Sequence, residues 1–477
     1  LTQLVRLDFF SDVSEKDFKK VVGADSKSDL YIYFYFRGLR LLNKTGIHTY
    51  ICSNSWLDVG YGAWLQEFLL DKTKVHFIID NHAKRSFDEA DVNTIISVID
   101  APYQKSDDHL VKFVAFKKPF EETLYSENLI KIEDAKEITK TDEFRVYPIK
   151  TSELRESGTE YEEDDEHKIG GKFTGDKWGG KYLRAPDIFI FIKRERAEII
   201  RNFKNLFDIF YGVKTGKVKF FYLDKLTINQ FKIERDYYYP LVHTSQKINK
   251  IFIEKTAYLF SSKRSIQEMK NTGASDYIKW GEKNRMNVGD SVESHTPHWY
   301  SLSFEDIDVL FFRFWDKRFF SPIAVSKLTC SDNFCYGKVK KREWSGKLAI
   351  NSTFYFMQIE IFGNANQGQG VLTTYMEYDY PFIVLPDLDL IDEKKARSIL
   401  NVIGNREIND IFVECGIDPQ SKIPIEEQEP NPLQDRAELD KVVFDALELT
   451  EDERKEVYRA TCRLVWNRIS KAKSMKK

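Results

Sequence analysis

The sequence lacks long hydrophobic runs. No apolar run approaches the roughly 18 residues that a membrane-spanning helix needs, so we expect no such helix. The first ten residues, "LTQLVRLDFF", lack the basic and apolar regions of a signal peptide and start with Leu rather than Met. We therefore expect a cytoplasmic protein, and a chain that is a piece of something longer.

Cysteine is also scarce, with five in 477 residues. Cys330 and Cys335 are the one close pair, and no histidine stands at zinc-ligand spacing from them. This pattern favours reduced thiols over a disulfide framework or a metal site.

An excess of positive charge is absent as well. The formal net charge is -3 and the pI is about 6.3, which excludes a basic field over the whole protein. Nucleic-acid binding would need a local basic surface.

Aromatic residues, by contrast, are abundant at 14%, with 36 Phe and 24 Tyr. A chain of this size and composition predicts two to four domains with large packed cores. In residues 1–120, β-branched runs such as "IHTYICS", "VHFIID" and "VNTIISVID" alternate with helical periodicity. This alternation predicts an α/β layer with a mostly parallel sheet, of which about three strands are visible.

The rest of the chain divides by composition. Residues 121–176 are polar, include the acidic run at 160–166, and predict a linker or insertion. Residues 177–390 mix short β-like runs with helical pieces, which predicts an α+β region. Residues 391–477 read as helices, and a capping box of Thr450 and Glu453 should start the last one near Glu451.

The stretch D-V-G-Y-G, Asp58–Gly62, resembles the start of a nucleotide or methyl-donor loop. In such loops the glycines follow the strand end directly, so that backbone N–H groups face the ligand. Here residues 54–57 intervene, and Ala63-Trp64 replaces the third glycine. A structural turn is therefore the favoured interpretation, and a donor loop the alternative.

Ordered blocks along most of the chain resemble adenine-N6 DNA methyltransferases of the γ type that carry a TaqI-like specificity domain, many of them fused restriction–modification proteins. The resemblance starts in residues 29–98, "DLYIYFYFRGLRLLNKTGIHTYICSNSWLDVGYGAWLQEFLL" and "VHFIIDNHAKRSFDEADVNTIISV". It continues in "KWGGKYLRAPDIF", "YGVKTGKVKFFYL", "GASDYIKWGE", "AINSTFYFMQIEIFGNANQGQGVL" and "IVLPDLDL".

The resemblance implies an α/β fold. A partial Rossmann-like methyltransferase sheet at 1–120 would be followed by the insertion at 121–176, a mixed α+β target-recognition domain at 177–390 and a helical C-terminal tail at 391–477. It implies binding of double-stranded DNA, base flipping, and S-adenosylmethionine as cofactor.

Two motifs that this family uses for catalysis are missing. The sequence contains neither the glycine-rich donor loop nor N-P-P-Y, and it has no Pro-Pro dipeptide. "DAPY", Asp100–Tyr103, follows a strand but lacks the first proline and comes too late in the chain. We therefore expect no catalytic residue in this chain, and an N-terminal half or separate subunit that binds most of the S-adenosylmethionine.

Three residues are candidates for the pocket that takes the flipped base. The segment "SFDEADV" places Phe87 where the family stacks an aromatic ring on that base, a contact worth roughly 1–3 kcal/mol. A Phe packed at the base of a loop is an equal alternative. Asn54 and Trp56 are expected at the pocket rim, with support of the core the more favoured role.

Basic residues on loops are the candidates for phosphate contact. They lie in "GVKTGKVKF", "FFRFWDKRFF" and "GKVKKRE", and are Lys214, Lys217, Lys219, Arg313, Lys317, Arg318, Lys338, Lys340, Lys341 and Arg342. For any single one, a solvated surface charge is the more common outcome. Arg184 in "YLRAP" lies between apolar residues and suggests a structural ion pair.

Two functions follow. The first is the DNA-recognition part of a site-specific adenine methyltransferase that is inactive alone. The second is a non-enzymatic interaction or scaffold protein, a remnant that kept the fold, which the net charge of -3 would suit.

Overall fold

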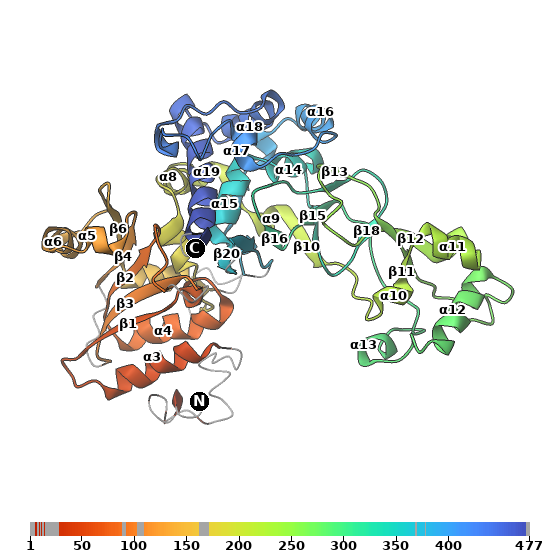
Figure 1. The fold of residues 1–477 in the computed structure, drawn as a ribbon, viewed down its shortest axis with the longest axis horizontal. Helices are drawn as coiled ribbons and strands as arrows, with labels where there is room; N and C mark the ends of the chain where they lie inside the picture. Colours follow the sequence, from red (N-terminus) through yellow and green to blue (C-terminus); the bar gives the residue numbers. More distant parts are fainter. Residues whose placement is uncertain are drawn as a thin grey trace. The chain divides into compact units, whose positions relative to one another are not determined.

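The computed structural model describes residues 5–6, 9, 11, 14, 28–87, 92–102, 109–161, 171–367, 370–376 and 378–473, with only the backbone at 290, 366 and 367. The chain forms two compact units (Figure 1). The first comprises Leu1–Arg194, Met357–Phe382 and Ala460–Lys477, and the second comprises Glu195–Phe356 and Ile383–Arg459.

A six-stranded sheet forms the centre of the first unit. Its strand order is β1-β3-β2-β4-β6-β5. The strands are β1 (Ile47–Ser53), β2 (Val75–Asn81), β3 (Thr94–Asp100), β4 (Leu110–Phe116), β5 (Thr139–Lys140) and β6 (Phe144–Lys150).

Most neighbouring strands of this sheet are antiparallel. Only β2 and β4 pair in parallel, whereas β3 runs antiparallel to both β1 and β2. The expectation of a mostly parallel sheet is therefore wrong. A parallel connection needs a crossover, usually a helix, and the described part of residues 82–93, between β2 and β3, contains none.

Helices α3 (Leu30–Leu41) and α4 (Ala63–Lys72) pack on one face of the sheet, and their buried side chains join those of the strands in one core. Helix α3 starts at Asp29, whose side chain caps the Leu30 N–H at 2.7 Å. Its buried residues are spaced three and four apart, as an amphipathic helix requires, and are Ile32, Tyr35, Phe36 and Leu39.

Residues 121–176 are more than a linker. Strand β6 pairs along the whole of β4, and its Phe144 and Val146 are fully buried. The remaining elements of the first unit are α5 (Phe120–Thr123), α6 (Ser126–Asp134), α7 (Thr151–Ser157), β7 (Thr159–Glu160), β8 (Lys172–Phe173), a π-helix at Gly179–Arg184, α8 (Asp187–Glu195), β20 (Asn364–Gln367) and β21 (Val371–Thr373). Most of the acidic run at 160–166 lies outside the described residues.

The second unit contains a five-stranded sheet of order β10-β19-β15-β17-β13 and a four-stranded sheet of order β11-β14-β12-β18, and β9 pairs with β22. The strands are β9 (Ile200–Asn202), β10 (Phe207–Tyr211), β11 (Tyr222–Leu223), β12 (Tyr238–Val242), β13 (Phe252–Ile253), β14 (Ala257–Phe260), β15 (Val309–Phe311), β16 (Phe314–Trp315), β17 (Ile323–Ala324), β18 (Thr329–Cys330), β19 (Cys335–Val339) and β22 (Val384–Pro386).

Its helices are α9 (Phe203–Leu206), α10 (Val218–Phe221), α11 (Lys225–Phe231), α12 (Gly273–Lys283), α13 (Asp290–Glu293), α14 (Glu343–Ala349), α16 (Glu393–Ile403), α17 (Ile411–Cys415) and α18 (Gln434–Ala446). Two of the four boundaries between the units fall within α15 (Thr353–Phe362) and α19 (Glu451–Lys473). The predicted capping box is confirmed, because the Thr450 N–H donates to Glu453 Oε2 at 2.8 Å and α19 starts at Glu451.

Candidate functional site

A small polar pocket lies in the first unit, where β1 and β2 end. Its volume is about 80 Å³. The strand ends contribute Asn54, Asp80 and His82, and β3 contributes Asn93 just before its start. The opposite wall comes from α15, β20, β21 and the end of α19, through residues such as Glu360, Asn364, Leu372, Arg468 and Lys471.

Two amide oxygens in this pocket accept no hydrogen bond from the residues that the structure describes. The Asn54 backbone N–H donates to the Asn93 carbonyl at 3.0 Å, and Asn93 Nδ2 donates to the Ala365 carbonyl at 3.2 Å. The side-chain oxygens of Asn54 and Asn93 are buried, and among the described residues neither accepts a hydrogen bond. Buried polar atoms are normally paired, so these oxygens are available to a donor from a ligand or an ordered water.

Charged side chains close the other side of the pocket in pairs. Asp80 Oδ1 lies 3.1 Å from Lys471 Nζ, and Glu360 Oε1 lies 2.7 Å from Arg468 Nη2. All four side chains are largely buried. Asp58, Arg85 and Arg184 also line the pocket, and Asp58 pairs with Arg184, so its wall combines ion pairs with hydrogen-bonding side chains.

His82 is the titratable group of this pocket with a displaced pKa. Burial lowers the pKa of His82 to about 4, although Asp80 Oδ2 lies 3.6 Å from its Nε2. The ring is therefore neutral at pH 7.

The folded state should lose stability to protonation of His82 as the pH falls from about 6.5 to about 4, by up to about 3 kcal/mol, because the unfolded chain binds that proton first. Urea unfolding of the wild type and of His82→Gln, at pH 7 and at pH 4.5, measures this. We expect the variant to lose less stability on acidification than the wild type. Equal losses would show that His82 does not contribute.

The two predicted rim residues separate in the structure. Asn54 lines the pocket, whereas Trp56 is fully buried in the core, with its ring 5.6 Å from Tyr35 and 5.8 Å from Trp178. Phe87 lies two residues after the pocket residue Arg85 and is 43% exposed, so its ring is accessible. Its stacking role stays a prediction.

The D-V-G-Y-G turn is occupied by protein contacts. Asp58 accepts hydrogen bonds from Arg184 Nη1 at 2.7 Å and from the Gly180 N–H at 2.9 Å. The Lys177 ammonium pairs with Asp379 and also donates to the Asp58 carbonyl. The structural ion pair of Arg184 is confirmed, and Asp58 joins two segments of the first unit.

The glycines of this turn allow close backbone approach. A Cβ on Gly62 would lie 2.0 Å from the Trp56 carbonyl oxygen, and a Cβ on Gly60 would lie 2.6 Å from Tyr378 Cε1. Packing therefore explains the glycine pattern. The "DAPY" stretch at Asp100–Tyr103 is the end of a strand. Strand β3 ends at Asp100, and the buried Ala101 donates its N–H to the Gly46 carbonyl. Tyr103 lies outside the described residues.

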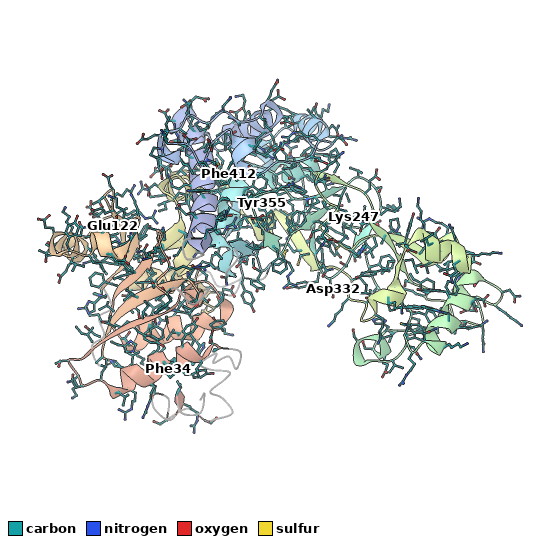
Figure 2. The ribbon with its side chains drawn as sticks, in the orientation of Figure 1. Phe34, Glu122, Lys247, Asp332, Tyr355 and Phe412 are labelled. Carbon is teal, nitrogen blue, oxygen red and sulfur yellow. The ribbon has the colours of Figure 1, made fainter. Side chains whose placement is uncertain are left out.

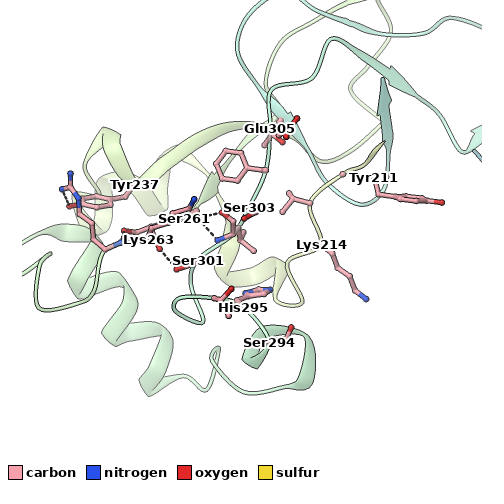
Figure 3. A pocket seen from close by; sticks show the side chains of 18 of the residues that line it. Tyr211, Lys214, Tyr237, Ser261, Lys263, Ser294, His295, Ser301, Ser303 and Glu305 are labelled. Atoms are coloured by element: carbon pink, nitrogen blue, oxygen red, sulfur yellow. Dashed lines mark hydrogen bonds between the residues drawn. The ribbon is translucent and has the colours of Figure 1, made fainter. Parts of the chain in front are cut away.

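The second unit carries a larger groove, with a volume of about 1170 Å³ (Figure 3). Hydroxyl groups dominate its lining: Ser261, Ser262, Ser294, Thr296, Ser301, Ser303 and Thr329. Three cationic side chains, Lys214, Lys263 and Arg264, and two carboxylates, Asp236 and Glu305, share it. Cations and hydroxyls together are the usual donors to phosphate oxygens.

Hydrogen bonds fix the loop that presents Lys263 and Arg264. The Ser262 hydroxyl accepts from the Arg264 N–H at 3.1 Å, and Ser301 Oγ donates to the Ser262 carbonyl at 2.6 Å. The Tyr300 hydroxyl donates to the Arg264 carbonyl at 3.0 Å. Lys263 and Arg264 were missed in the sequence, although they stand together beside two serines.

Of the ten predicted phosphate contacts, Lys214 alone lines this groove. Lys217 directly precedes α10, and Lys219 lies within it. Four others pair with carboxylates: Lys338 with Glu305, Lys340 with Asp208, and both Lys341 and Arg342 with Asp389. Arg313 and Arg318 are exposed and Lys317 is half-buried.

The described residues offer neither a metal cluster nor a membrane-spanning helix. In the described ranges, no group of three or more His, Cys, Asp or Glu side chains could hold a metal ion. No described helix is both long and apolar enough to cross a membrane. All five cysteines are buried free thiols.

Comparison with known families identifies both parts of the chain. Residues 7–87 match the Eco57I restriction-modification methylase family, and residues 175–375 match the C-terminal domain of type II methyltransferase M.Eco57I. The chain carries Eco57I-type restriction–modification methylase domains. The first match contains Asn54, Asp58 and Phe87, and the second contains the whole groove.

Individual relatives agree with the Eco57I-type assignment. The chain is 23% identical to type II methyltransferase M.AccI of Acinetobacter calcoaceticus over 421 residues, which are 82% of this chain and 70% of M.AccI. It is 24% identical to type II methyltransferase M.BstVI of Geobacillus stearothermophilus over 254 residues, 50% of this chain and 39% of M.BstVI. Both relatives are type II methyltransferases, in agreement with the two Eco57I-type matches.

The fold is shared with a solved relative. The type IIL restriction-modification enzyme MmeI, solved in complex with DNA, superposes with a TM-score of 0.50 at 16% identity. The superposition covers 94% of this chain and 55% of MmeI, so this chain spans about half the length of that enzyme.

Proposed function

We propose that this chain is the DNA-recognition part of a site-specific adenine-N6 DNA methyltransferase of a restriction–modification system, acting in the cytoplasm. The observation that carries the proposal is the groove of the second unit, which lies within the segment matched by the M.Eco57I C-terminal domain. Methyl transfer from S-adenosylmethionine would need a further half of the catalytic domain, because both catalytic motifs are absent from this sequence.

The charges of the groove support binding of the DNA backbone. Lys214 and Lys263 are exposed, and neither pairs with a carboxylate in the part of the chain that the structure describes. Unpaired cations can displace condensed counterions from phosphates, which is the main source of affinity for duplex DNA. Asp236 and Glu305 would repel phosphate, but carboxylates can accept a hydrogen bond from the cytosine amino group in the major groove.

Selection from a random duplex library by the purified chain at moderate salt tests the proposal. Enrichment of one adenine-containing motif, with affinity that falls steeply as salt rises, is the expected result. An unenriched pool together with salt-independent binding would contradict it.

Lys214→Ala should weaken binding to every duplex sequence alike and reduce the slope of log affinity against log salt by about 1, because one phosphate contact is lost. Lys341→Ala is the matched control: Lys341 already pairs with Asp389 at 2.8 Å, so its removal should change the slope little. Fluorescence anisotropy between about 50 and 200 mM salt measures both. Equal slopes of log affinity against log salt for the wild type and Lys214→Ala would show that Lys214 contacts no phosphate.

The polar pocket of the first unit supports a role in holding the flipped adenine. The two free amide oxygens, of Asn54 and Asn93, can accept hydrogen bonds from an amino group. The exposed ring of Phe87 is available to restore the stacking that the extruded base loses. S-adenosylmethionine would be bound mainly by the other half of the domain.

Phe87→Ala should lower methyl transfer by the joined enzyme by about 5- to 150-fold, the equivalent of 1–3 kcal/mol of stacking. Phe87→Tyr keeps the ring face and should retain activity within a few fold. Incorporation of labelled methyl groups into a duplex that contains the selected site measures both. If Phe87→Ala has unchanged activity, Phe87 packs against the protein and does not stack on the base.

An interaction or scaffold protein is the second candidate. It is favoured by the pairing of four predicted basic residues with carboxylates, which removes them from phosphate binding. Under this alternative, duplex binding would be weak and would not depend on Lys214.

A further inference from the structure

His295 presents an imidazole ring to the groove of the second unit. It lies two residues after α13, among the side chains that line the groove (Figure 3). The residue is half-buried, and its ring centroid lies 5.5 Å from that of Phe221, which is fully buried. Because Phe221 belongs to the packed core, this contact restricts the orientation of the imidazole.

One nitrogen of the imidazole is already hydrogen-bonded, and that bond fixes the tautomer. His295 Nδ1 lies 2.8 Å from the Trp299 carbonyl oxygen. A carbonyl oxygen only accepts, so Nδ1 carries the proton and Nε2 of the neutral ring is an acceptor. Trp299 is itself held, because its ring packs on the buried Phe220 with centroids 4.5 Å apart. Within the described residues Nε2 makes no hydrogen bond, so a ligand in the groove can use it.

This nitrogen adds an acceptor without a charge to the groove. The three cations of the groove only donate, and its two carboxylates, Asp236 and Glu305, repel phosphate. A third carboxylate, Asp332 (labelled in Figure 2), stands beside the groove, since its N–H donates to the carbonyl of the lining residue Val213 at 3.2 Å. A neutral acceptor such as His295 Nε2 can meet a hydrogen-bond donor of DNA without further repulsion of the backbone.

We propose that His295 recognises one base of the target site, by accepting a hydrogen bond at Nε2 from the exocyclic amino group of an adenine or a cytosine in the major groove. Adenine N6 and cytosine N4 are the amino donors at that edge of the duplex. Phosphate oxygens only accept, so an unprotonated Nε2 has no bond to make with the backbone. The assignment rests on the function proposed above and makes His295 a specificity-determining residue.

The fixed position of the ring favours this role. A side chain that is held in place before DNA binds loses little conformational entropy on binding, and it can reject a base that offers no donor. Lys214 and Lys263 are exposed and flexible by comparison, which suits phosphates, because these lie alike in every sequence.

Duplex selection with the wild type, His295→Phe and His298→Phe tests the assignment, at about pH 8, where an unperturbed imidazole is neutral. Phenylalanine keeps a ring beside Phe221 but has no acceptor. His298 is the matched control: it lies in the same loop, is half-buried, stacks on Tyr300 with centroids 5.1 Å apart, and is not among the residues that line the groove. We expect His295→Phe to lose the base preference at one position of the motif and to keep it elsewhere, and His298→Phe to keep the whole motif.

Base analogues test the same contact on the wild-type chain. At the position where His295→Phe loses its preference, purine replaces adenine, or 2-pyrimidinone replaces cytosine, so that the amino group is removed. The wild type should bind the analogue duplex about fivefold more weakly than the natural one, the equivalent of one hydrogen bond, whereas His295→Phe should bind both alike. The difference between the two proteins isolates the contact from any change in the duplex itself. Fluorescence anisotropy measures all four affinities.

Several results would overturn the role of His295. These are a uniform loss of affinity by His295→Phe with an unchanged motif, the same change of motif with His298→Phe, or an equal effect of the analogue on the wild type and on His295→Phe. An unenriched pool with the wild type would overturn the proposed function itself. A sharp wild-type motif that His295→Phe leaves unchanged would overturn the role of His295 alone.

Discussion

Asp58→Ala is expected to destabilise the first unit by about 3–5 kcal/mol. The change removes the carboxylate that holds Arg184 at 2.7 Å and the Gly180 N–H at 2.9 Å, and both donors are at a largely buried site. Breaking a buried pair costs this much because the remaining charge stays desolvated without a partner.

Asp71→Ala is the matched control on the neighbouring helix. Asp71 pairs with Arg155, but both side chains are more than a third exposed, so we expect a loss of at most about 1 kcal/mol. Hydrogen exchange of residues 179–184 and the midpoint of urea unfolding measure both variants, and the exchange readout assigns the effect to the first unit.

Asp58→Ala also distinguishes a structural turn at Asp58–Gly62 from a loop that binds the methyl donor. If Asp58 contacted S-adenosylmethionine, the isolated chain would bind the cofactor at micromolar concentration and Asp58→Ala would abolish that binding without a large loss of stability. That outcome would contradict the structural role inferred from the contacts of Asp58.

Local sequence signals predicted the elements but not their pairing. The helical periodicity between the first strands and the capping box at Thr450 are local signals, and the structure confirms a helix at Leu30–Leu41 and a helix start at Glu451. Strand direction depends on the connection between the strands. The short link between β2 and β3 indicates antiparallel pairing, whereas the β-branched composition of the strands had suggested a parallel sheet.

The candidate site was predictable only in part. The family resemblance placed Asn54 at the pocket rim, and it directly follows β1. His82 directly follows β2 and Asn93 directly precedes β3, and both were missed. The ion pairs of the predicted basic residues could not be predicted from the sequence, because the carboxylate partners of Lys338 and Lys341 are 33 and 48 residues away along the chain. The cluster of basic residues at 338–342 therefore predicted more unpaired positive charge than the structure has, whereas Lys263 and Arg264 were not predicted.

Methyl transfer is expected to be absent from the isolated chain and to appear when the other half of the catalytic domain is supplied. Under the proposed function Asn54, Asn93 and Phe87 would hold the flipped base, and the sequence contains neither N-P-P-Y nor the glycine-rich donor loop. Enzymes commonly accelerate reactions by a million-fold or more, so loss of the groups that hold the cofactor and the target amine is effectively all or none.

The measurement is incorporation of a labelled methyl group from S-adenosylmethionine into a duplex that contains the selected site. The isolated chain should give background counts, and the joined enzyme should give counts that depend on the adenine of the site. Methylation by the isolated chain would overturn the division of labour proposed here, and would require a donor site among residues that the contacts of Asp58 assign to packing.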